Sequence, residues 1–326
     1  MNAVDHNNVV IFDDRGIPSI MCRFVRPKDT EEVPAVFKIG DKVADAIYIS
    51  KYPNIVIDGR AYSMPMADPT VNITFDEAVQ ACRCKGLGWH LMTAVEYEYL
   101  LNQSREKGTM PHGNTDWGKD YYHNEEQGKV SNLGRTYTGT GPVTWNHDHT
   151  PYGVSDLNGN VWEWLAGLRI KDGVIEFIPG NKAASPYCDL SKDSTEWQQA
   201  ETSKGPVRAN VECGEITITD AVAADDYEPN YDGVRIEELE VKLSEIPQVL
   251  KDLGIIPDKR AEEEGKTYVY FDATEGEYLP VRGSAFYDTS DSGPSALSLS
   301  DPRSNSCDYI GFRSAFYEVN GKLITE

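Results

Sequence analysis

Residues 152–164 read YGVSDLNGNVWEW, and this stretch constrains the fold more than any other. Trp162 and Trp164 flank Glu163, so in a β-strand both indole rings project to one face and supply a large apolar area. The preceding residues 158–160, Asn-Gly-Asn, are typical of a tight turn. The stretch therefore predicts a turn followed by a strand that packs into a core.

The same turn offers oxygen atoms from Asn158, Asn160 and Glu163 that a calcium ion could use. Two amides and one carboxylate are a thin ligand set, so the pattern favours a structural turn. Cys82 and Cys84 form a C-x-C pair without a second pair of matching spacing, which favours structural thiols over a zinc site. We therefore predict no metal and no other cofactor.

Upstream of the turn, strand patterns give way to helix patterns. Asp58–Gly59 lies between β-branched and aromatic runs, which is a strong signal for a β-hairpin. Thr74 and Glu77 then have the spacing of a capping box, and so predict the start of a helix. Thr93 and Glu96 repeat that spacing and predict a second helix.

Four pieces of sequence, taken in order, resemble the formylglycine-generating enzyme and sulfatase-modifying family, which is a branch of the C-type lectin fold. The resemblance covers residues 46–171 and 276–316 and implies an α+β C-type lectin fold of the formylglycine-generating enzyme-like branch. The pieces are YISKYP at 48–53, the two helical segments TFDEAVQAC at 74–82 and TAVEYEYL at 93–100, NGNVWEW at 158–164, and the terminal RG at 282–283 with IGFR at 310–313.

The resemblance also sets the predicted domain organisation. The region between the two covered parts is acidic and reads as an irregular insertion before the C-terminal variable segment, with one short helix whose N-cap is Ser244 and which Gly254 ends. We predict an N-terminal β-hairpin extension at 1–44 and a C-type lectin-like domain at 45–326, with the insertion at about 171–272 and a variable region at about 282–313.

The charge of the chain restricts its partners. It has 53 acidic and 31 basic residues, which give a formal net charge of -22. Such a field repels phosphate backbones and anionic lipid heads, so we expect no nucleic-acid partner and no membrane insertion. The start, MNAVDHNNVVIF, lacks the features of a signal peptide, and the chain is expected to be made as a soluble cytosolic product.

An oxidase activity is not favoured by the residues. The formylglycine-generating enzymes that resemble this chain use a pair of cysteines after the terminal Arg-Gly, but residues 282–302 contain no cysteine and Cys307 stands alone farther on. His112, His147 and His149 could meet in space, yet scattered histidines are more often ordinary surface or core residues. We predict a protein that is not an enzyme. The alternative is a formylglycine-generating-type oxidase relative with a relocated or degenerate active site.

The composition of the C-terminal segment points to a different branch of the fold. Between Ser284 and Tyr309 there is no Glu, Lys, Gln, Met or Trp. The segment resembles the variable proteins of diversity-generating retroelements, in which a reverse transcriptase replaces the adenines of a template copy that then overwrites the end of the gene. Asn codons of the AAC and AAT type are the preferred targets. Changing their first two bases yields Ser, Asp, Tyr, Cys, Ala and Phe, but never the five missing residues.

This resemblance implies a ligand-binding, receptor-recognition protein, with an unknown protein or glycan on a cell surface as the partner. The chain would be carried on a virion, such as a phage tail, or on a cell surface. Ser, Asp and Tyr suit such a surface because Tyr gives contact area at low entropy cost, while Ser and Asp adapt their hydrogen bonds. The candidate variable, ligand-binding positions are Ala285, Tyr287, Asp288, Ser290, Asp291, Ser298, Ser300, Asp301, Cys307, Asp308 and Tyr309.

The candidate positions alternate with residues that read as fixed by the fold. We expect the candidate side chains to converge on one exposed face, with Tyr287 and Tyr309 as the energetic anchors, because alternation along an extended segment separates two faces. The side chains expected to point inward are Leu297, Leu299, Ile310 and Phe312. Arg282 and Arg313 are expected to be partly buried and paired, with Glu163 as a candidate partner.

Overall fold

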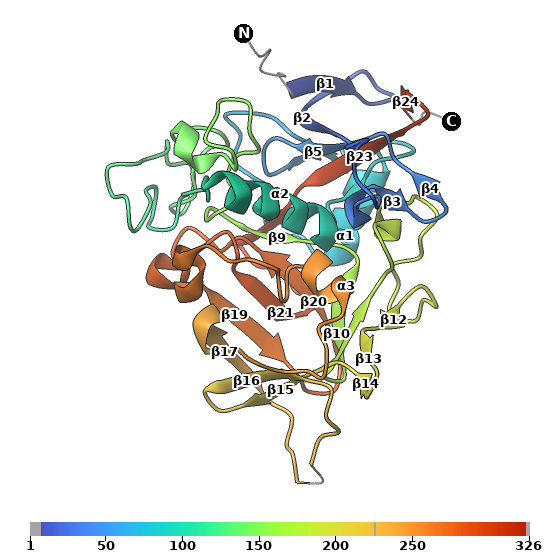
Figure 1. The fold of residues 1–326 in the computed structure, drawn as a ribbon. Coiled ribbons are helices and arrows are strands. Elements are labelled where there is room, and N and C mark those ends of the chain that lie inside the picture. The colour runs from blue at the N-terminus through green and yellow to red at the C-terminus, as the bar shows by residue number, and fades with distance from the viewer. Residues whose placement is uncertain (1–7, 225, 324–326) are drawn as a thin grey trace.

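The computed structural model describes residues 8–224 and 226–323. Two β-sheets dominate it, and the helix α2 (Ala94–Lys107) crosses the middle of the molecule between them (Figure 1). Among the described residues no helix is both long enough and apolar enough to span a membrane.

The first sheet joins the beginning and the end of the chain. Its strands run in the order β1-β2-β5-β23-β24, with β8 also paired to β23. In β5, Ala46 lies opposite Glu318 of β23, so segments more than 250 residues apart in sequence are hydrogen-bonded neighbours. The bounds are β1 (Asn8–Phe12), β2 (Pro18–Val25), β5 (Ala46–Ser50), β8 (His90–Leu91), β23 (Ser314–Val319) and β24 (Lys322–Leu323).

The predicted hairpin is confirmed. It consists of β6 (Ile55–Ile57) and β7 (Arg60–Tyr62), which pair antiparallel around a two-residue turn. Asp58 has a φ of 48° and Gly59 a φ of 75°, the left-handed pair that a tight hairpin requires. Two further two-stranded ribbons are present: β3 (Lys38–Ile39) with β4 (Lys42–Val43), and β13 (Glu201–Thr202) with β14 (Gly205–Pro206).

Both predicted capping boxes are also confirmed. Thr74 caps α1 (Phe75–Arg83) and Thr93 caps α2, and each threonine hydroxyl accepts a hydrogen bond from the backbone N–H of the glutamate three residues on. The prediction for α3 (Gln248–Asp252) was wrong at its start, because the N-cap position is Pro247. Ser244 instead donates to Asp220, through both its backbone N–H and its hydroxyl.

The two capping threonines differ in burial, which gives a testable difference. Thr74 lies at the surface, so Thr74→Ala should lower the free energy of unfolding by about 1 kcal/mol, the usual cost of losing a cap. Thr93 is buried and also donates to Oδ1 of Asn181 at 2.6 Å, so Thr93→Ala leaves a buried acceptor unpaired and should cost about 2 kcal/mol. Urea denaturation of both variants measures the difference, and equal losses would contradict it.

The second sheet contains most of the remaining strands. Its main path is β17-β19-β21-β20-β10-β11-β15-β16-β18, with β12 paired to β11 and with β9 paired to both β20 and β22. The bounds are β9 (Trp162–Trp164), β10 (Leu168–Lys171), β11 (Val174–Phe177), β12 (Gln198–Gln199), β15 (Arg208–Glu212), β16 (Glu215–Thr219), β17 (Tyr231–Arg235), β18 (Glu240–Lys242), β19 (Tyr268–Asp272), β20 (Glu277–Arg282), β21 (Leu297–Pro302) and β22 (Ile310–Phe312).

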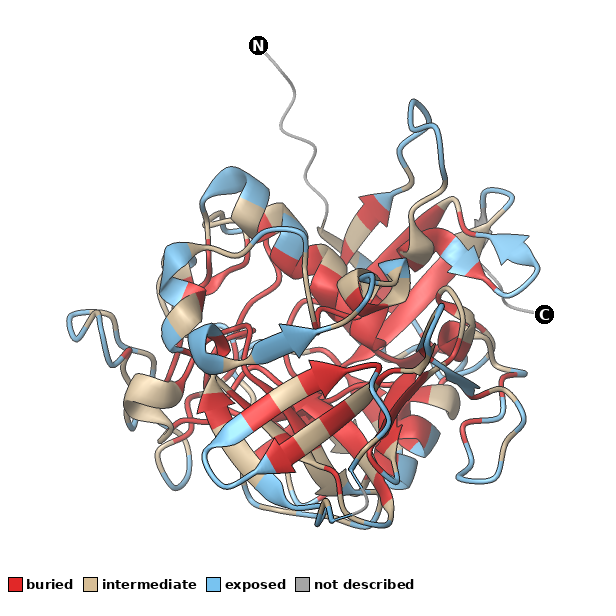
Figure 2. Ribbon diagram, turned by 60° about the horizontal axis from the view of Figure 1, so that its bottom comes forward, coloured by how far each residue is buried: buried red, intermediate tan, exposed pale blue. Residues whose placement is uncertain are grey.

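The expectation that residues 171–272 are irregular was wrong. This region contributes β11, β12, β15, β16, β17, β18 and β19 to the second sheet. In β16 (EITIT), Ile216 and Ile218 are buried and alternate with polar residues, which is the period of a strand with one covered face. Figure 2 shows this alternation of buried and partly exposed residues along the strands that come forward in that view. The many acidic residues of this region made the two-residue period of its strands hard to recognise in the sequence.

The turn and strand predicted at 158–164 are confirmed. Gly159 has a φ of 71°, and a Cβ added there would lie 2.1 Å from the carbonyl oxygen of Asn114, so both the conformation and the close approach require glycine. Trp162, Trp164 and Phe312 belong to one buried cluster, and Phe312 in β22 pairs directly with Trp164 in β9. The two covered parts of the sequence therefore share a core, as predicted.

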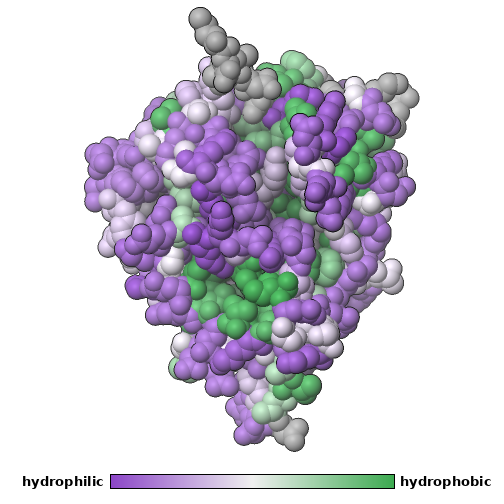
Figure 3. Space-filling model, viewed as in Figure 1, coloured by the Kyte–Doolittle hydropathy of each residue, from purple (hydrophilic) through white to green (hydrophobic). Residues whose placement is uncertain are grey.

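One face of the molecule is mostly polar. In the orientation of Figure 1, hydrophilic residues cover most of this face, and one hydrophobic area interrupts them in its lower half (Figure 3). This distribution agrees with the excess of acidic residues in the sequence.

Candidate ligand-binding surface

Two buried arginines hold the ends of the candidate segment. In Arg313, Nε and Nη2 donate to the two carboxylate oxygens of Glu163 at 2.6 Å and 2.5 Å. Arg282 donates from Nη1 to Oε2 of Glu98 at 3.1 Å, and its guanidinium lies 4.9 Å from the ring centre of Tyr97. Both arginine side chains are at most 1% exposed. The predicted pairing of these arginines is confirmed, as is Glu163 as the partner of Arg313, and both arginines are more deeply buried than the partial burial that was expected.

Between these arginines, the chain forms a loop with the 3-10 helix η6 (Thr289–Asp291), the strand β21, a second loop and the strand β22. A cavity of about 280 Å³ opens at this segment. Six of the eleven candidate positions line it, together with residues of β9, β17, β19, β20 and β22. The six are Tyr287, Asp288, Ser298, Ser300, Asp301 and Tyr309, and the others are Trp162, Tyr231, Tyr270, Val281 and Ile310.

The remaining candidate positions lie outside the cavity. Ser290, Asp291 and Cys307 are partly buried and Asp308 is exposed. Ala285 is 0% exposed and belongs to the same buried cluster as Trp162 and Phe312, so the expectation that it faces outward was wrong. A methyl group fits a core as readily as a surface, and the sequence pattern could not separate the two. Ser298 lines the cavity but is only 6% exposed, so the expectation of an exposed side chain was wrong there too.

Aromatic rings form much of the cavity. Tyr287 and Tyr309 meet edge to face with ring centres 5.6 Å apart, and Trp162 meets Tyr270 in the same way at 6.4 Å. Aromatic pairs of this geometry hold their rings in fixed positions. Trp117, from the long loop between α2 and β9, is 59% exposed and approaches the ring of Tyr287 at 6.4 Å, so it extends the aromatic surface beyond the cavity.

Sequence reasoning missed the aromatic residues that the region 171–272 contributes. Tyr270 lies directly opposite Ser298, because β19 and β21 pair in parallel. Tyr231 reaches the same cavity from β17, because β17 pairs with β19. The one local signal was the stretch YVYFD in β19, where tyrosines alternate with the buried Val269 and Phe271. That alternation identifies a strand with two different faces, but not its neighbours.

The carboxyl groups of the cavity are held in a poorly solvated environment. Burial raises the pKa of Asp288 to about 6, although the backbone N–H of Ala285 donates to this carboxylate at 2.7 Å. Burial also raises the pKa of Asp301, against hydrogen bonds from Ser298 at 2.7 Å and Asn305 at 2.6 Å. Among the described residues, those that line this cavity include no Arg, Lys or His. The cavity is therefore aromatic and acidic.

Side-chain oxygens of the turn that a calcium ion could have bound are instead engaged in hydrogen bonds and an ion pair within the protein. Asn160 accepts a hydrogen bond from the backbone N–H of Thr136 at 2.8 Å and donates to its carbonyl at 3.1 Å, while Glu163 binds Arg313. These contacts support the interpretation as a structural turn. The described residues include no group of three or more His, Cys, Asp or Glu side chains that could hold a metal ion.

His112, His147 and His149, which the sequence allowed to meet in space, do not all come together. The ring centre of His112 lies 5.8 Å from that of His149, and His112 stacks on His123 at 3.7 Å. His147 is buried, accepts a hydrogen bond from the backbone N–H of Val154, and has a pKa that burial lowers to about 4. Its position is that of a core residue.

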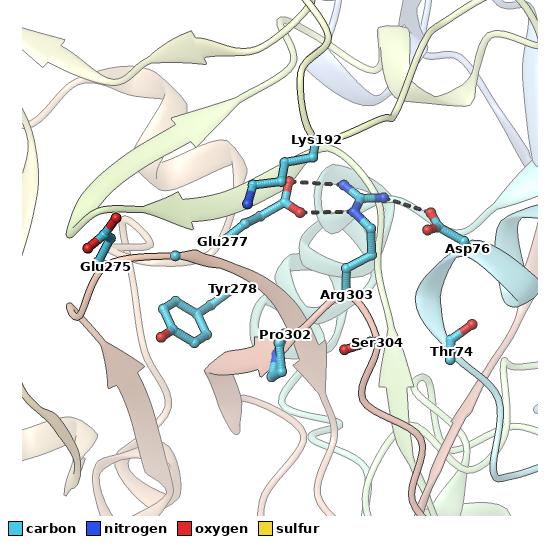
Figure 4. Close-up of a pocket in the computed structure, with 10 residues that line it drawn as sticks. Thr74, Asp76, Lys192, Glu275, Glu277, Tyr278, Pro302, Arg303 and Ser304 are labelled. Carbon is cyan, nitrogen blue, oxygen red and sulfur yellow. Dashed lines mark hydrogen bonds and ion pairs between the residues drawn. The ribbon is translucent and has the colours of Figure 1, made fainter.

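A second cavity, of about 540 Å³, lies at the other end of β20 and β21 (Figure 4). Arg303 extends across it between two carboxylates, at 2.9 Å from Glu277 and 2.7 Å from Asp76. In this cavity the cation is Arg303 itself, and it forms ion pairs with both Glu277 and Asp76. Arg303, which directly follows β21, thus links this strand to β20 and α1.

Comparison with known proteins identifies one family over part of the chain. Residues 51–208 match the family model of the sulfatase-modifying factor enzyme 1-like domain. The formylglycine-generating enzyme of Mus musculus is 36% identical to this chain over 105 residues, which are 30% of this chain and 27% of the mouse protein. This chain therefore matches little more than a quarter of that enzyme's length.

Solved structures similar to this chain include three with low sequence identity. The Major Tropism Determinant I1 variant is 13% identical with a TM-score of 0.33, and the match covers 84% of this chain and 50% of that chain. PvdO from Pseudomonas aeruginosa is 14% identical with a TM-score of 0.36, at 95% and 98% coverage. Treponema denticola variable protein 1 is 12% identical with a TM-score of 0.36, at 95% and 98% coverage.

The family match confirms the resemblance to the sulfatase-modifying branch for residues 51–171. It continues to residue 208, into the region that was predicted to be an insertion, and does not extend to residues 276–316. The fold is the α+β C-type lectin type predicted from the sequence, mostly sheet with few helices.

Proposed function

We propose that this chain is a non-enzymatic ligand-binding protein whose C-terminal surface, at residues 282–313, is diversified by a retroelement through adenine-directed mutagenesis. Its ligand is a protein or glycan on a cell surface. The chain acts as a receptor-recognition protein, carried on a virion or on a cell surface.

One observation carries this proposal. Six candidate positions, spread from Tyr287 to Tyr309, line a single cavity, whereas the residues that alternate with them are at most 2% exposed. Such a segment can change the side chains that face a ligand while the core stays constant. The buried set is Leu297, Leu299, Ile310 and Phe312, all four of which point inward as predicted.

A codon library tests the separation of surface from core. Codons for the ten candidate positions other than Ala285 are randomised within the set reachable from AAC and AAT, and the variants are displayed and sorted for folding and for binding to a test protein. Most variants should fold, because nine of the ten side chains are at least partly exposed and large losses of stability come mainly from core substitutions. Ser298, which is 6% exposed, should be the least tolerant of the ten. The matched control randomises the four buried positions in the same way and should destroy folding. Widespread loss of folding in the first library would overturn the proposal.

The mutagenesis itself has a separate test in the gene's surroundings. A reverse transcriptase gene and a second copy of the terminal coding segment, differing only at adenines of the template, should lie near the gene. A copy that differs equally at all four bases would contradict the retroelement while leaving ligand binding intact.

The family match favours one other candidate, an oxidase relative of the formylglycine-generating type with a relocated or degenerate site. Cys307 is the one cysteine in the segment 282–313, and its S–H donates to the side-chain oxygen of Asn305 at 3.2 Å. Mass spectrometry of a cysteine-containing peptide incubated with the chain in air should show no formylglycine. Turnover that Cys307→Ser abolishes would establish the oxidase instead.

A further inference from the structure

The aromatic cavity has the composition of a site for an organic cation. Five of its residues carry aromatic rings: Trp162, Tyr231, Tyr270, Tyr287 and Tyr309. They come from β9, β17, β19 and both loops of the candidate segment, so the rings surround the cavity from separate elements. The face of an aromatic ring is negative and attracts a cation within about 6 Å of its centre.

The carboxylates of the cavity add to this attraction and lack a cation of their own. Asp288 and Asp301 accept hydrogen bonds from neutral donors, namely the N–H of Ala285, the hydroxyl of Ser298 and the amide of Asn305. The cavity at the other end of β20 and β21 contrasts with it, because there Arg303 pairs with both neighbouring acids. Two partly buried carboxylates without a positive partner are costly. A bound cation would remove that cost.

The polar groups of the cavity distinguish between kinds of cation. The carboxylates and the hydroxyls of Ser298 and Ser300 accept hydrogen bonds, and a guanidinium or a primary ammonium has N–H groups to donate to them. A quaternary ammonium has no N–H and could not donate to these acceptors. A guanidinium is also planar, so it can stack on a tyrosine ring while it binds a carboxylate.

We propose that this cavity receives an arginine or lysine side chain of a protein ligand. The inference rests on the proposed function, and it names the class of partner: a protein that presents an exposed basic side chain to the candidate surface. The net charge of -22 favours the same partner, because a strongly negative field steers basic proteins toward this chain.

Small probes test the chemistry of the cavity directly. The folded chain is titrated with acetyl-arginine methylamide, with the lysine equivalent, and with the citrulline equivalent, which has nearly the shape of arginine but no charge. Chemical shifts of the tyrosine and tryptophan rings report the binding. The arginine and lysine probes should bind at least about tenfold more tightly than citrulline, because the charge supplies the attraction. Equal binding of all three, or tighter binding of choline than of arginine, would overturn the proposal.

Three variants locate the site. Asp288→Asn and Tyr287→Leu should each lower the affinity for the arginine probe by about tenfold or more. Asp308→Asn is the matched control, since Asp308 belongs to the same segment but is exposed and does not line the cavity. Thermal unfolding of each variant shows that it remains folded. Equal weakening by Asp288→Asn and Asp308→Asn would mean a general charge effect, and would reject the cavity as the site.

The library and the probe titrations distinguish a failure of the cation site from a failure of the proposed binding function. If library variants fold and bind test proteins, but neither cationic probe enters the cavity, the binding function stands and the cation site falls. If the cationic probes bind while randomised variants fail to fold, the cavity keeps its chemistry and the variable surface is rejected.

Discussion

Replacing Arg313 with alanine is expected to lower the free energy of unfolding by about 3 kcal/mol or more, the usual cost of breaking a buried ion pair. Glu163 is 1% exposed and would be left without its ion-pair partner. Four backbone carbonyls would also lose a donor, since the guanidinium now reaches Ser50, Lys51, Ser155 and Asp156. Urea denaturation measures the loss.

Two variants separate the ion pair from a general effect of removing charge. Arg15→Ala removes the same side chain at an exposed position and should change stability by less than about 0.5 kcal/mol. Arg313→Lys keeps the charge but not the planar fork that binds both oxygens of Glu163, so it should remain clearly destabilised. If Arg313→Ala unfolds at the same urea concentration as the parent chain, the buried ion pair with Glu163 does not stabilise the fold as described.

Local sequence signals were sufficient for the elements that adjacent residues determine. A capping box needs residues three apart, as Thr93 and Glu96 are, and a two-residue hairpin needs one left-handed pair, as Asp58–Gly59 provides. The strand at Trp162–Trp164 was predictable because large apolar residues at alternate positions are typical of a β-strand and of few other structures. These predictions concern contacts within a few residues, where backbone geometry dictates the outcome.

Long-range arrangement was predictable only where the resemblance supplied it. The pairing of Arg313 with Glu163 joins residues 150 positions apart, and the shared motifs indicated it. Where the resemblance ended, at residues 171–272, the strands and their order were missed. Tyr270 reaches the cavity through a parallel pairing with β21, and no residue near Tyr270 encodes that partner. The acidic and aromatic character of the cavity therefore emerged only from the folded chain.

Ala285 shows the limit of composition as evidence for a binding surface. Alanine is one of the residues that diversified asparagine codons produce, and so it entered the candidate set. Its side chain is 0% exposed and packs within the cluster that contains Phe286 and Phe312, so the fold restricts it whatever the history of its codon. Position 285 should therefore accept small residues only.

Ala285→Tyr tests that restriction and should lower the free energy of unfolding by about 3 kcal/mol or more. A phenol ring has no room in a closely packed cluster, and its hydroxyl would be buried without an assured partner. Asp308→Tyr is the matched control, since it introduces the same residue in the same segment at an exposed position, and should change stability by less than about 0.5 kcal/mol. Both tyrosines are reachable from asparagine codons, so a mutagenic process would produce both. Equal stability of the two variants would return Ala285 to the variable surface, whereas loss at Ala285 alone would reduce that surface to ten positions.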